Sequence, residues 1–373
     1  MHVLADLTWK FVDLKVTVIV FRRLILIFGL QLIYFGLFAQ EPSITAQQGW
    51  LDLRSWDFNA QGTIPIFGEY EFYWKQLYEP EDFDQGVVTA PTYYDVPSFW
   101  NEMVIGDSII GKYGYATLRL QILLPASAVG KNLSFRIPTT STSTLLYCNN
   151  QLIYQLGTVS ADPDQTIPSY RPGIADIPFA SDTLEIVVQQ ANYYHRRAGL
   201  WNPFKLGLEP QVRKARRRSL LVEAFLAGCM LIMSIYHFGF YYLRRKDSST
   251  LYFGLACLAL FFRILATGEY QFGHFISDSW FVIVRVEYLS MMTLGAFLML
   301  FFDRLFDKES YPILTKGIVG LAALFSVIIL FTPPKVFTYT YYGFHLMLLM
   351  TIINFSKILI SAVYKKREGA LAF

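Results

Sequence analysis

Seven polar and aromatic side chains in the first half of the chain are of the types that hold small polar molecules. Aromatic faces stack on C–H groups, while planar amide, imidazole and guanidinium groups form hydrogen bonds with hydroxyls. The candidates for a ligand-binding site are Trp100, Tyr115, Arg119, Asn149, His195, Arg196 and Trp201. The last three belong to a loop at 193–201 that is dense in aromatic and basic residues and lies just before the apolar half. Contact with helix ends explains this loop as well as ligand binding does.

The other four candidates each have a structural explanation as well. Trp100 and Tyr115 are aromatic residues of the kind that fill a core or its edge. Arg119 alternates with apolar neighbours, which is typical of a solvated strand face or of a structural ion pair. Asn149 precedes a second asparagine, and asparagine tolerates the left-handed conformation of a tight turn. The sequence leaves both explanations open for all four.

Four ionisable side chains in the second half are informative because charges are costly inside a membrane span. Arg263 lies near the end of one apolar run, Arg285 and Glu287 near the start of the next, and Glu269 in the loop between them. Since this loop joins two antiparallel helices, we expect all four at one level. The pairs Arg263–Glu287 or Arg285–Glu269 would form a polar layer that couples ligand binding to the helices. Alternatively, each arginine extends along its helix to reach water.

Enzymatic chemistry has no recognisable machinery in this sequence. It contains no glycine-rich phosphate loop, no G-x-S-x-G turn, no H-E-x-x-H zinc motif and no kinase or cyclase signature. Of three cysteines only Cys148 lies outside the apolar runs, so the first half cannot form an internal disulfide. His237 and His345 sit in different apolar runs, where packing explains them. We therefore expect no catalytic residues, no metal and no cofactor.

Composition is typical of a membrane protein. Of the 373 residues 54% are hydrophobic and the mean hydropathy is +0.35, which is too apolar for an ordinary soluble chain. The net charge of +3 is small, and the basic residues cluster at the ends of apolar runs. This pattern suits a lipid bilayer as partner and does not favour nucleic acid.

Residues 1–40 have the organisation of a secretory signal peptide or an N-terminal anchor. Arg22 and Arg23 precede an apolar stretch at 24–38, and Ala39 supplies a small residue before a polar start. Leu37 stands three residues before a cut after Ala39, so the cleavage signal is weak. Cleaved or not, this segment would place the residues that follow outside the cytoplasm.

Residues 48–208 are expected to form an extracytoplasmic all-β jelly-roll sandwich. Short β-rich runs alternate with turn residues, which is the pattern of such folds. The clearest runs are 115–124, 133–137 and 184–188, and a hairpin is predicted at 145–154 around Asn149-Asn150. About 160 residues suffice for one hydrophobic core.

The remaining residues are expected to form an α-helical transmembrane bundle, since their apolar runs can each cross a bilayer core of about 30 Å. The predicted spans are 220–243, 251–267, 280–302, 313–331 and 336–364. Basic residues follow the first, third and fifth spans, whereas the two intervening short loops hold only Lys335. The positive-inside rule then places the β-domain outside the cytoplasm.

Two short segments border these spans. Residues 209–219 contain the basic run RKARRR at 213–218 and are expected to link the last strand to the first span. Outside the cytoplasm this charge disfavours the predicted orientation, but it can pair with lipid phosphates there. Residues 365–373 begin in a basic cluster and continue into a new apolar start. They predict a sixth helix that is truncated in this sequence.

With these segments placed, the chain resembles the bacterial seven-transmembrane receptors with diverse intracellular signalling modules. In the apolar half the resemblance rests on GCMLIMSIYH at 228–237, YYLRR at 241–245, LYFGLACL at 251–258 and RIL at 263–265. In the first half it rests on GEYEFYW at 68–74, VPSFW at 96–100, GYATLR at 114–119 and the Asn149-Asn150 turn. These outer motifs also resemble the sugar-binding jelly-roll domain at the front of β-galactosidase-type enzymes. The resemblance covers about 48–368, and the common order of its motifs makes it specific.

The resemblance implies a sensor in the bacterial cytoplasmic membrane whose outer domain binds a small-molecule ligand, with carbohydrate as a candidate class. It also implies a seven-helix unit that passes the signal to an intracellular cyclase, kinase, phosphatase or diguanylate cyclase module. The last two spans and that module are absent from this sequence. Signalling as a homodimer is the simplest arrangement for such a receptor.

Two other functions stay open. One is a transporter or channel with an outer accessory domain, and the other is a membrane-tethered carbohydrate-binding protein. The predicted spans contain no internal proline and no repeat, which disfavours a transporter. Five helices with internal charges are more than a simple anchor needs.

Overall fold

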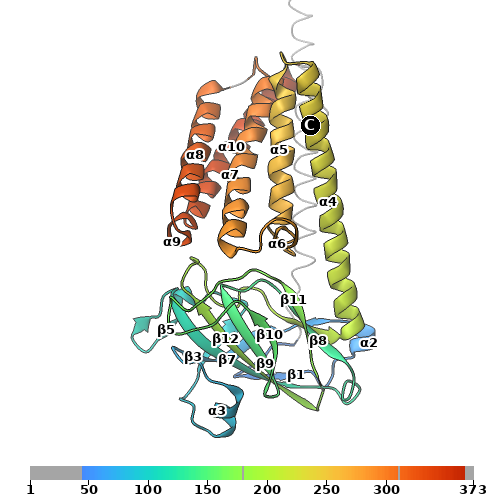
Figure 1. Cartoon of the computed structure of the whole chain (residues 1–373), viewed down its shortest axis with the longest axis vertical. Coiled ribbons are helices and arrows are strands. Elements are labelled where there is room, and N and C mark those ends of the chain that lie inside the picture. Colours follow the sequence, from blue (N-terminus) through green and yellow to red (C-terminus); the bar gives the residue numbers. More distant parts are fainter. Residues whose placement is uncertain (1–43, 179, 310, 366–373) are drawn as a thin grey trace, which may run out of the picture.

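The computed structural model describes residues 44–178, 180–309 and 311–365, which form a β-domain joined to a helical bundle (Figure 1). The predicted class, a jelly-roll-like β-sandwich followed by membrane helices, is confirmed. The predicted signal peptide or anchor at 1–40 lies outside the described residues. The same holds for 366–373 of the predicted sixth helix.

The larger sheet of the β-domain has the strand order β10–β9–β12–β7–β3–β4, and β1 pairs in parallel with β7. At its centre β7 and β12 are antiparallel, from Gly114 opposite Asn192 to Leu123 opposite Thr183. The strands are β1 (Trp50–Asp52), β3 (Gly68–Trp74), β4 (Thr92–Val96), β7 (Gly114–Leu123), β9 (Ser143–Cys148), β10 (Gln151–Leu156) and β12 (Thr183–Asn192).

The smaller sheet has the order β11–β8–β13–β2. Its strands are β2 (Ile64–Pro65), β8 (Leu133–Ile137), β11 (Gly173–Asp176) and β13 (Lys205–Leu208). A separate pair is formed by β5 (Val104–Ile105) and β6 (Ser108–Ile109). Single turns of helix occupy three connections: α2 (Phe58–Gln61), α3 (Pro80–Asp84) and the 3-10 turn η1 (Trp100–Glu102).

The alternation of side chains along the strands fills the space between the sheets. On β7, Leu118 and Leu120 are fully buried, while Arg119 between them is half-buried on the other face. Phe72 of β3 and Phe135 of β8 meet in the same core. Burying a side chain of this size stabilises the fold by about 1.5–3 kcal/mol. All three strands predicted at 115–124, 133–137 and 184–188 are confirmed, and β12 is longer than predicted.

The predicted hairpin is also confirmed. Asn149 and Asn150 connect β9 to β10 with φ values of 47° and 65°. Positive φ at both central residues is the requirement of the tight hairpin turn whose twist matches the flanking strands.

Among the residues that the structure describes, five helices are long and apolar enough to cross a membrane: α4 (Glu209–Leu243), α5 (Ser248–Leu265), α7 (Trp280–Leu305), α8 (Pro312–Phe331) and α10 (Thr340–Tyr364). Helix α4 packs on α5, α5 packs on α7, and α8 and α10 pack on α7 and on each other. Two single-turn helices, α6 (Phe272–Phe275) and α9 (Pro334–Phe337), lie at the end of the bundle that faces the β-domain (Figure 1). The predicted fifth span is divided, since α9 precedes α10.

Helix α4 differs from the prediction for the segment between the two parts. Residues 209–219, expected as a linker, are its first turns, and the helix continues unbroken for 35 residues. Glu209 and Pro210 favour a helix start, because the acid suits the helix dipole and proline fits the first turn. At about 1.5 Å per residue α4 is about 52 Å long, well beyond a bilayer core of about 30 Å. Its first turns therefore stand outside the apolar layer, against β8, β11 and β13.

Candidate ligand-binding and coupling site

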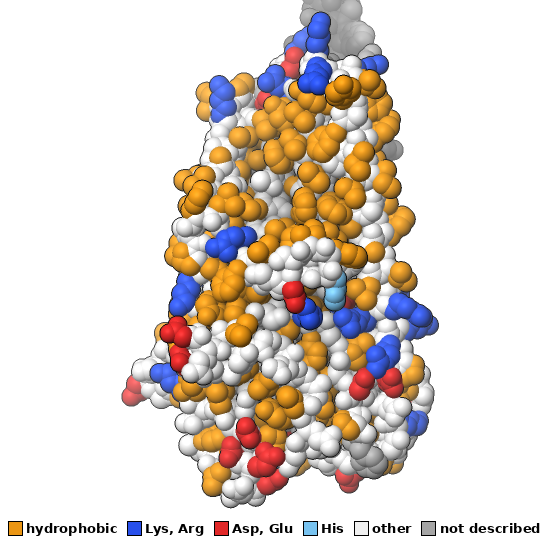
Figure 2. All heavy atoms as spheres, in the orientation of Figure 1, with side chains coloured by type: hydrophobic (Ala, Val, Ile, Leu, Met, Phe, Trp, Pro, Cys, Tyr) orange, Lys and Arg blue, Asp and Glu red, His pale blue; other side chains and the backbone are white. Residues whose placement is uncertain are grey.

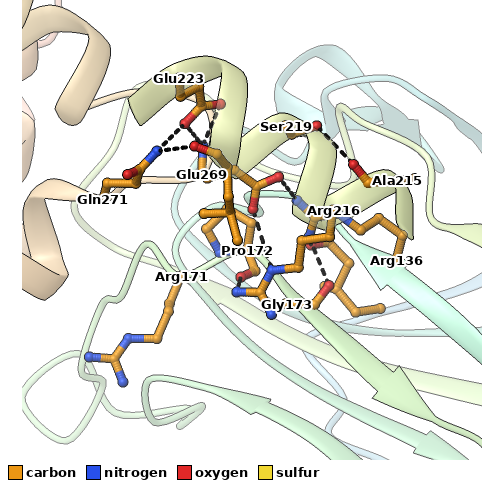
Figure 3. A network of polar contacts seen from close by, with 12 residues as sticks. Arg136, Arg171, Pro172, Gly173, Ala215, Arg216, Ser219, Glu223, Glu269 and Gln271 are labelled. Carbon is orange, nitrogen blue, oxygen red and sulfur yellow. Dashed lines mark hydrogen bonds and ion pairs between the residues drawn. The ribbon is translucent and has the colours of Figure 1, made fainter. Parts of the chain in front are cut away.

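The loop between α5 and α7 presents Glu269 to the β-domain, where two arginines pair with it (Figure 3). Arg136 of β8 donates a hydrogen bond to Glu269 Oε1, and Nε of Arg216 in α4 lies 3.5 Å from Oε2. The Glu269 side chain is only 4% exposed, so the two arginines take the place of water as its partners. Arg136 is held in place by the carbonyl oxygens of Ile137 and Gly173, at 3.0 and 2.8 Å.

The same loop is bound to α4 through a second carboxylate, Glu223. It accepts the backbone N–H of Glu269 at 3.1 Å and the side-chain amide of Gln271 at 3.3 Å. Gly268 has φ +66°, and a Cβ there would lie 2.3 Å from Glu223 Oε1, so glycine permits this close approach. We call Arg136, Arg216, Glu223 and Glu269 the junction clamp. It ties β-domain, α4 and the α5–α7 loop together.

The basic run at 213–218 contributes to this junction. Arg213 pairs with Asp176 of β11 at 2.5 Å and with Glu209 at 2.7 Å, and Arg216 donates to the carbonyl of Pro172 at 3.2 Å. The remaining basic residues of the run are exposed. Figure 2 shows Lys and Arg side chains gathered where the apolar surface of the bundle meets the β-domain, a position that suits lipid phosphates.

A cavity of about 200 Å³ lies beside the clamp, between the loop at 193–201 and helices α5, α7 and α10. We call it the junction cavity. It brings together three of the predicted ligand residues, His195, Arg196 and Trp201, with two of the predicted coupling residues, Arg263 and Glu287. Its lining also includes Arg197, Tyr270, Tyr288 and Tyr341.

The arginines of the junction cavity differ in their partners. Arg263 donates from Nη1 to the backbone oxygen of Glu287 at 2.9 Å and lies 3.6 Å from its Oε1. Arg196 is 6% exposed, and its guanidinium lies over the rings of Tyr341 and Tyr342, at 4.1 and 5.2 Å from their centroids. Its Nε has no hydrogen-bond acceptor. The cavity therefore holds more positive charge than its single carboxylate balances.

His195 adds no charge to the cavity at neutral pH. The pKa of its imidazole is lowered to about 3, chiefly by burial and also by the charges of Arg196 and Arg197, while a hydrogen bond with the Arg197 backbone opposes the shift. His195 Nδ1 lies 3.2 Å from the backbone nitrogen and 3.3 Å from the carbonyl oxygen of Arg197, so it can accept or donate a hydrogen bond there according to the tautomer. Asn192 fixes the backbone of His195 through hydrogen bonds of 3.0 and 2.8 Å.

The other four predicted ligand residues lie away from the junction cavity. Trp100 is fully buried, with its ring 5.9 Å from Phe72 and 5.6 Å from Trp74. Because it has no exposed surface, its placement favours a core role. Tyr115 is half-buried at the start of β7, next to Gly114, where a Cβ would lie 2.5 Å from the Trp74 ring.

Arg119 and Asn149 have structural partners on the β-domain. Arg119 lies 2.5 Å from Glu185 and 3.3 Å from Glu71, and its guanidinium is 4.7 Å from the Phe83 ring. The Asn149 side chain accepts the N–H of Glu185 at 2.9 Å. An ion-pair role for Arg119 and a turn role for Asn149 account for both positions.

The four predicted coupling residues do not form one set. Of the two alternative pairs, Arg263–Glu287 is present, while Glu269 pairs with arginines of the β-domain and of α4. Arg285 instead donates to the carbonyls of Phe281 at 3.1 Å and Thr332 at 3.2 Å. It therefore connects α7 to the end of α8.

Residues that the sequence reasoning missed complete the junction. Glu223 carried a usable signal, because it is an acid within the apolar run at 220–243. Arg197 directly follows Arg196, which was predicted as a ligand residue, so the same loop pattern indicated it. Arg136 gave no signal, since an arginine that alternates with apolar residues on a strand reads as a solvated position.

Comparison with known proteins identifies the helical half. Residues 219–373 match the family described as 7TM diverse intracellular signalling, which is a receptor domain and not a catalytic one. The resemblance drawn from the sequence is thereby confirmed, and the chain is a multi-pass membrane protein. No curated protein matches the chain.

Solved structures with a similar part include β-glucuronidases from an uncultured Clostridium sp., Faecalibacterium prausnitzii and Ruminococcus gnavus, each matched by 39% of this chain. The sequence identities are 14%, 14% and 16%, and the TM-scores are 0.31, 0.31 and 0.30. The matched part spans only 28%, 31% and 27% of those enzymes.

Proposed function

We propose that this protein is a receptor of the bacterial cytoplasmic membrane that binds a small-molecule ligand outside the cell interior and relays the signal to an intracellular module. The junction cavity carries this proposal, because His195, Arg196 and Trp201 of the β-domain share it with Arg263 and Glu287 of the bundle. A ligand there contacts both parts of the protein at once. If the β-domain and the bundle can adopt two relative arrangements, a ligand that binds one of them more tightly shifts the equilibrium toward that arrangement.

The distribution of charge supports the proposed orientation. Arg244, Arg245 and Lys246 follow α4, and Arg304 lies in the last turn of α7. Both helices end at the side of the bundle away from the β-domain (Figure 1). The basic run near the β-domain is partly neutralised, since Arg213 and Arg216 pair with acids there. The positive charge at the end of the bundle away from the β-domain favours that end as the cytoplasmic side.

Carbohydrate is the ligand class that we propose. The junction cavity combines aromatic side chains, including Trp201 and Tyr341, with guanidinium groups that can bind hydroxyls. A carbohydrate-binding protein that is only tethered would have no need of bundle residues in its site.

Distance measurements across the bundle test the relay. Spin labels at Leu243 and Leu305, both exposed at the far ends of α4 and α7, report movement at the proposed cytoplasmic side. In nanodiscs, with the native cysteines replaced, a bound glycan is expected to change the label–label distance by about 1–2 Å or more. Trp201→Ala should weaken this response.

Two results would favour the alternatives. Glycan binding with unchanged distances would indicate a tethered binding protein without signalling. Uptake of the glycan into sealed liposomes would indicate a transporter.

A further inference from the structure

Two arginines of the junction cavity lack a carboxylate at ion-pair distance. In the described part of the chain Arg196 and Arg197 form no ion pair, whereas Arg263 lies against Glu287. Glu287 attracts all three guanidinium groups, and Arg196 also shares a hydrogen bond with the Tyr288 side chain, so one carboxylate serves three cations. Arg197 instead lies over the rings of Phe99 and Tyr341, at 5.0 and 4.8 Å from their centroids. The attraction of a cation to ring faces only partly offsets the cost of removing its charge from water.

Two polar atoms at this cavity are buried without an acceptor: Nε of Arg196 and Nε1 of Trp201. Buried donors in folded proteins are nearly always satisfied, so each of these needs an explanation. A guanidinium presents its N–H groups as a rigid fork that fits the two oxygens of a carboxylate or phosphate. An oxyanion beside Arg196 would supply an acceptor and the missing negative charge together.

We infer that the junction cavity binds the carboxylate or phosphate group of a compact ligand, with Arg196 as its principal anchor and Trp201 donating a further hydrogen bond. The inference rests on the proposed function, because it names the chemistry of the ligand at the same site. A volume of about 200 Å³ is below the about 300–1,000 Å³ of pockets for drug-sized molecules, so it suits an acidic group on a small body.

An adjoining cavity gives room for the rest of a larger ligand. It measures about 520 Å³, and Trp201 and Tyr270 line both spaces. Arg136 and Lys205 also lie on its wall, together with Glu223 and Glu269. The acidic group can therefore belong to a soluble sugar acid or to a lipid headgroup from the adjacent bilayer.

Binding of galacturonate, galactose and inorganic phosphate to the protein in phosphatidylcholine nanodiscs tests the inference. The two sugars differ only at C6, where galacturonate has a carboxylate and galactose a hydroxymethyl group. Because a hydrogen bond to a charged group is stronger than one to a neutral group, calorimetry should show galacturonate binding at least about tenfold more tightly than galactose. Arg196→Met should weaken galacturonate or phosphate binding at least about tenfold. Arg196→Lys, which keeps the charge but loses the fork, should fall between. Arg54→Met, a change of the same kind on the exposed surface, should have no effect.

Nanodiscs containing phosphatidylglycerol distinguish the two sources of the anion. If galacturonate affinity falls as the phosphatidylglycerol fraction rises, and Arg196→Met removes this dependence, the headgroup occupies the site. If the lipid has no effect and galacturonate or phosphate binds through Arg196, the ligand is soluble.

The inference fails if folded Arg196→Met and Arg196→Lys proteins bind galacturonate, phosphate and phosphatidylglycerol as the unchanged protein does, or if none of these three anions binds the unchanged protein. A galactose-induced change in the Leu243–Leu305 distance, without anion binding, would refute the anion site and leave the receptor proposal intact. Anion binding at Arg196 without any change in the Leu243–Leu305 distance would support the anion site and refute the receptor proposal.

Discussion

The larger sheet of the β-domain and the junction with the bundle each hold an arginine withdrawn from water, half-buried in the first and buried in the second, but the two charges are compensated differently. On the outer face Arg119 lies between Glu185 and Glu71, so two carboxylates serve one guanidinium. In the junction cavity Arg196 lies on tyrosine rings and has an unsatisfied Nε. An arginine with excess acid around it has a complete structural role. Arg196 has no acid at ion-pair distance, and we propose that a ligand supplies one.

The junction clamp shows a third arrangement, in which one buried acid has two bases. Glu269 holds Arg136 of the β-domain and Arg216 of α4 at once. The junction clamp thus joins the two parts of the protein through paired charges, whereas the neighbouring junction cavity has more cations than carboxylates.

Removing the acid of the clamp should have the largest effect. Glu269→Ala leaves Arg136, whose side chain is 18% exposed, without its carboxylate, and we expect a loss of about 3–5 kcal/mol in the free energy of unfolding. Denaturant titration in detergent micelles measures it. Asp278→Ala removes the exposed pair with Arg171 and should cost at most about 1 kcal/mol. Equal losses would show that the clamp is not distinguished by its burial.

Arg119→Met and Arg196→Met together test whether the two arginines differ in their contribution to stability. Without Arg119, Glu71 and Glu185 repel each other, and we expect a loss of about 2 kcal/mol. Arg196→Met removes an uncompensated charge as well as its ring contacts, so stability should change by less than about 1 kcal/mol. The same titration measures both. A loss at Arg196 as large as that at Arg119 would mean that Arg196 has a structural role after all.

Mild acid should destabilise the junction through His195. Its folded pKa is lowered from 6.5 to about 3, so between these values the unfolded chain takes up a proton that the folded protein does not. The stability contributed by the neutral ring is therefore present above pH 6.5 and lost as pH falls, by about 1.4 kcal/mol per pH unit. Comparing His195→Gln with the unchanged protein at pH 7 and pH 5 isolates this term. A pH dependence that survives the substitution would belong to other groups.

The turn at Asn149 should give the smallest effect. Asn149→Ala loses the hydrogen bond from the N–H of Glu185 and places alanine at positive φ, for a cost of about 1 kcal/mol. Asn149→Gly keeps the backbone freedom and should cost less. Galactose and galacturonate binding should be unchanged in both. A weaker affinity of either variant for these sugars would indicate that Asn149 contributes to ligand binding.

The sequence allowed prediction of whatever depends on local pattern. Asn149-Asn150 predicted the hairpin because the turn itself demands such residues, and Arg263 and Glu287 were noticed because charge is rare in an apolar run. The partner of Glu269 could not be predicted, since Arg136 lies 133 residues earlier in the chain and only the packing of two domains brings them together. Trp100 shows the reverse limit, because residue type does not separate a core aromatic from a binding one.

The unbroken course of α4 has a mechanical consequence. Because α4 is continuous from the last strand of the β-domain to Leu243, a rotation or displacement at Glu209 should be transmitted to Leu243. The rotation of one helix end relative to the other about the helix axis is therefore fixed by the number of residues between them. One inserted residue would rotate the two ends relative to each other by about 100° and lengthen the helix by about 1.5 Å, whereas seven would restore the relative rotation to within about 20°.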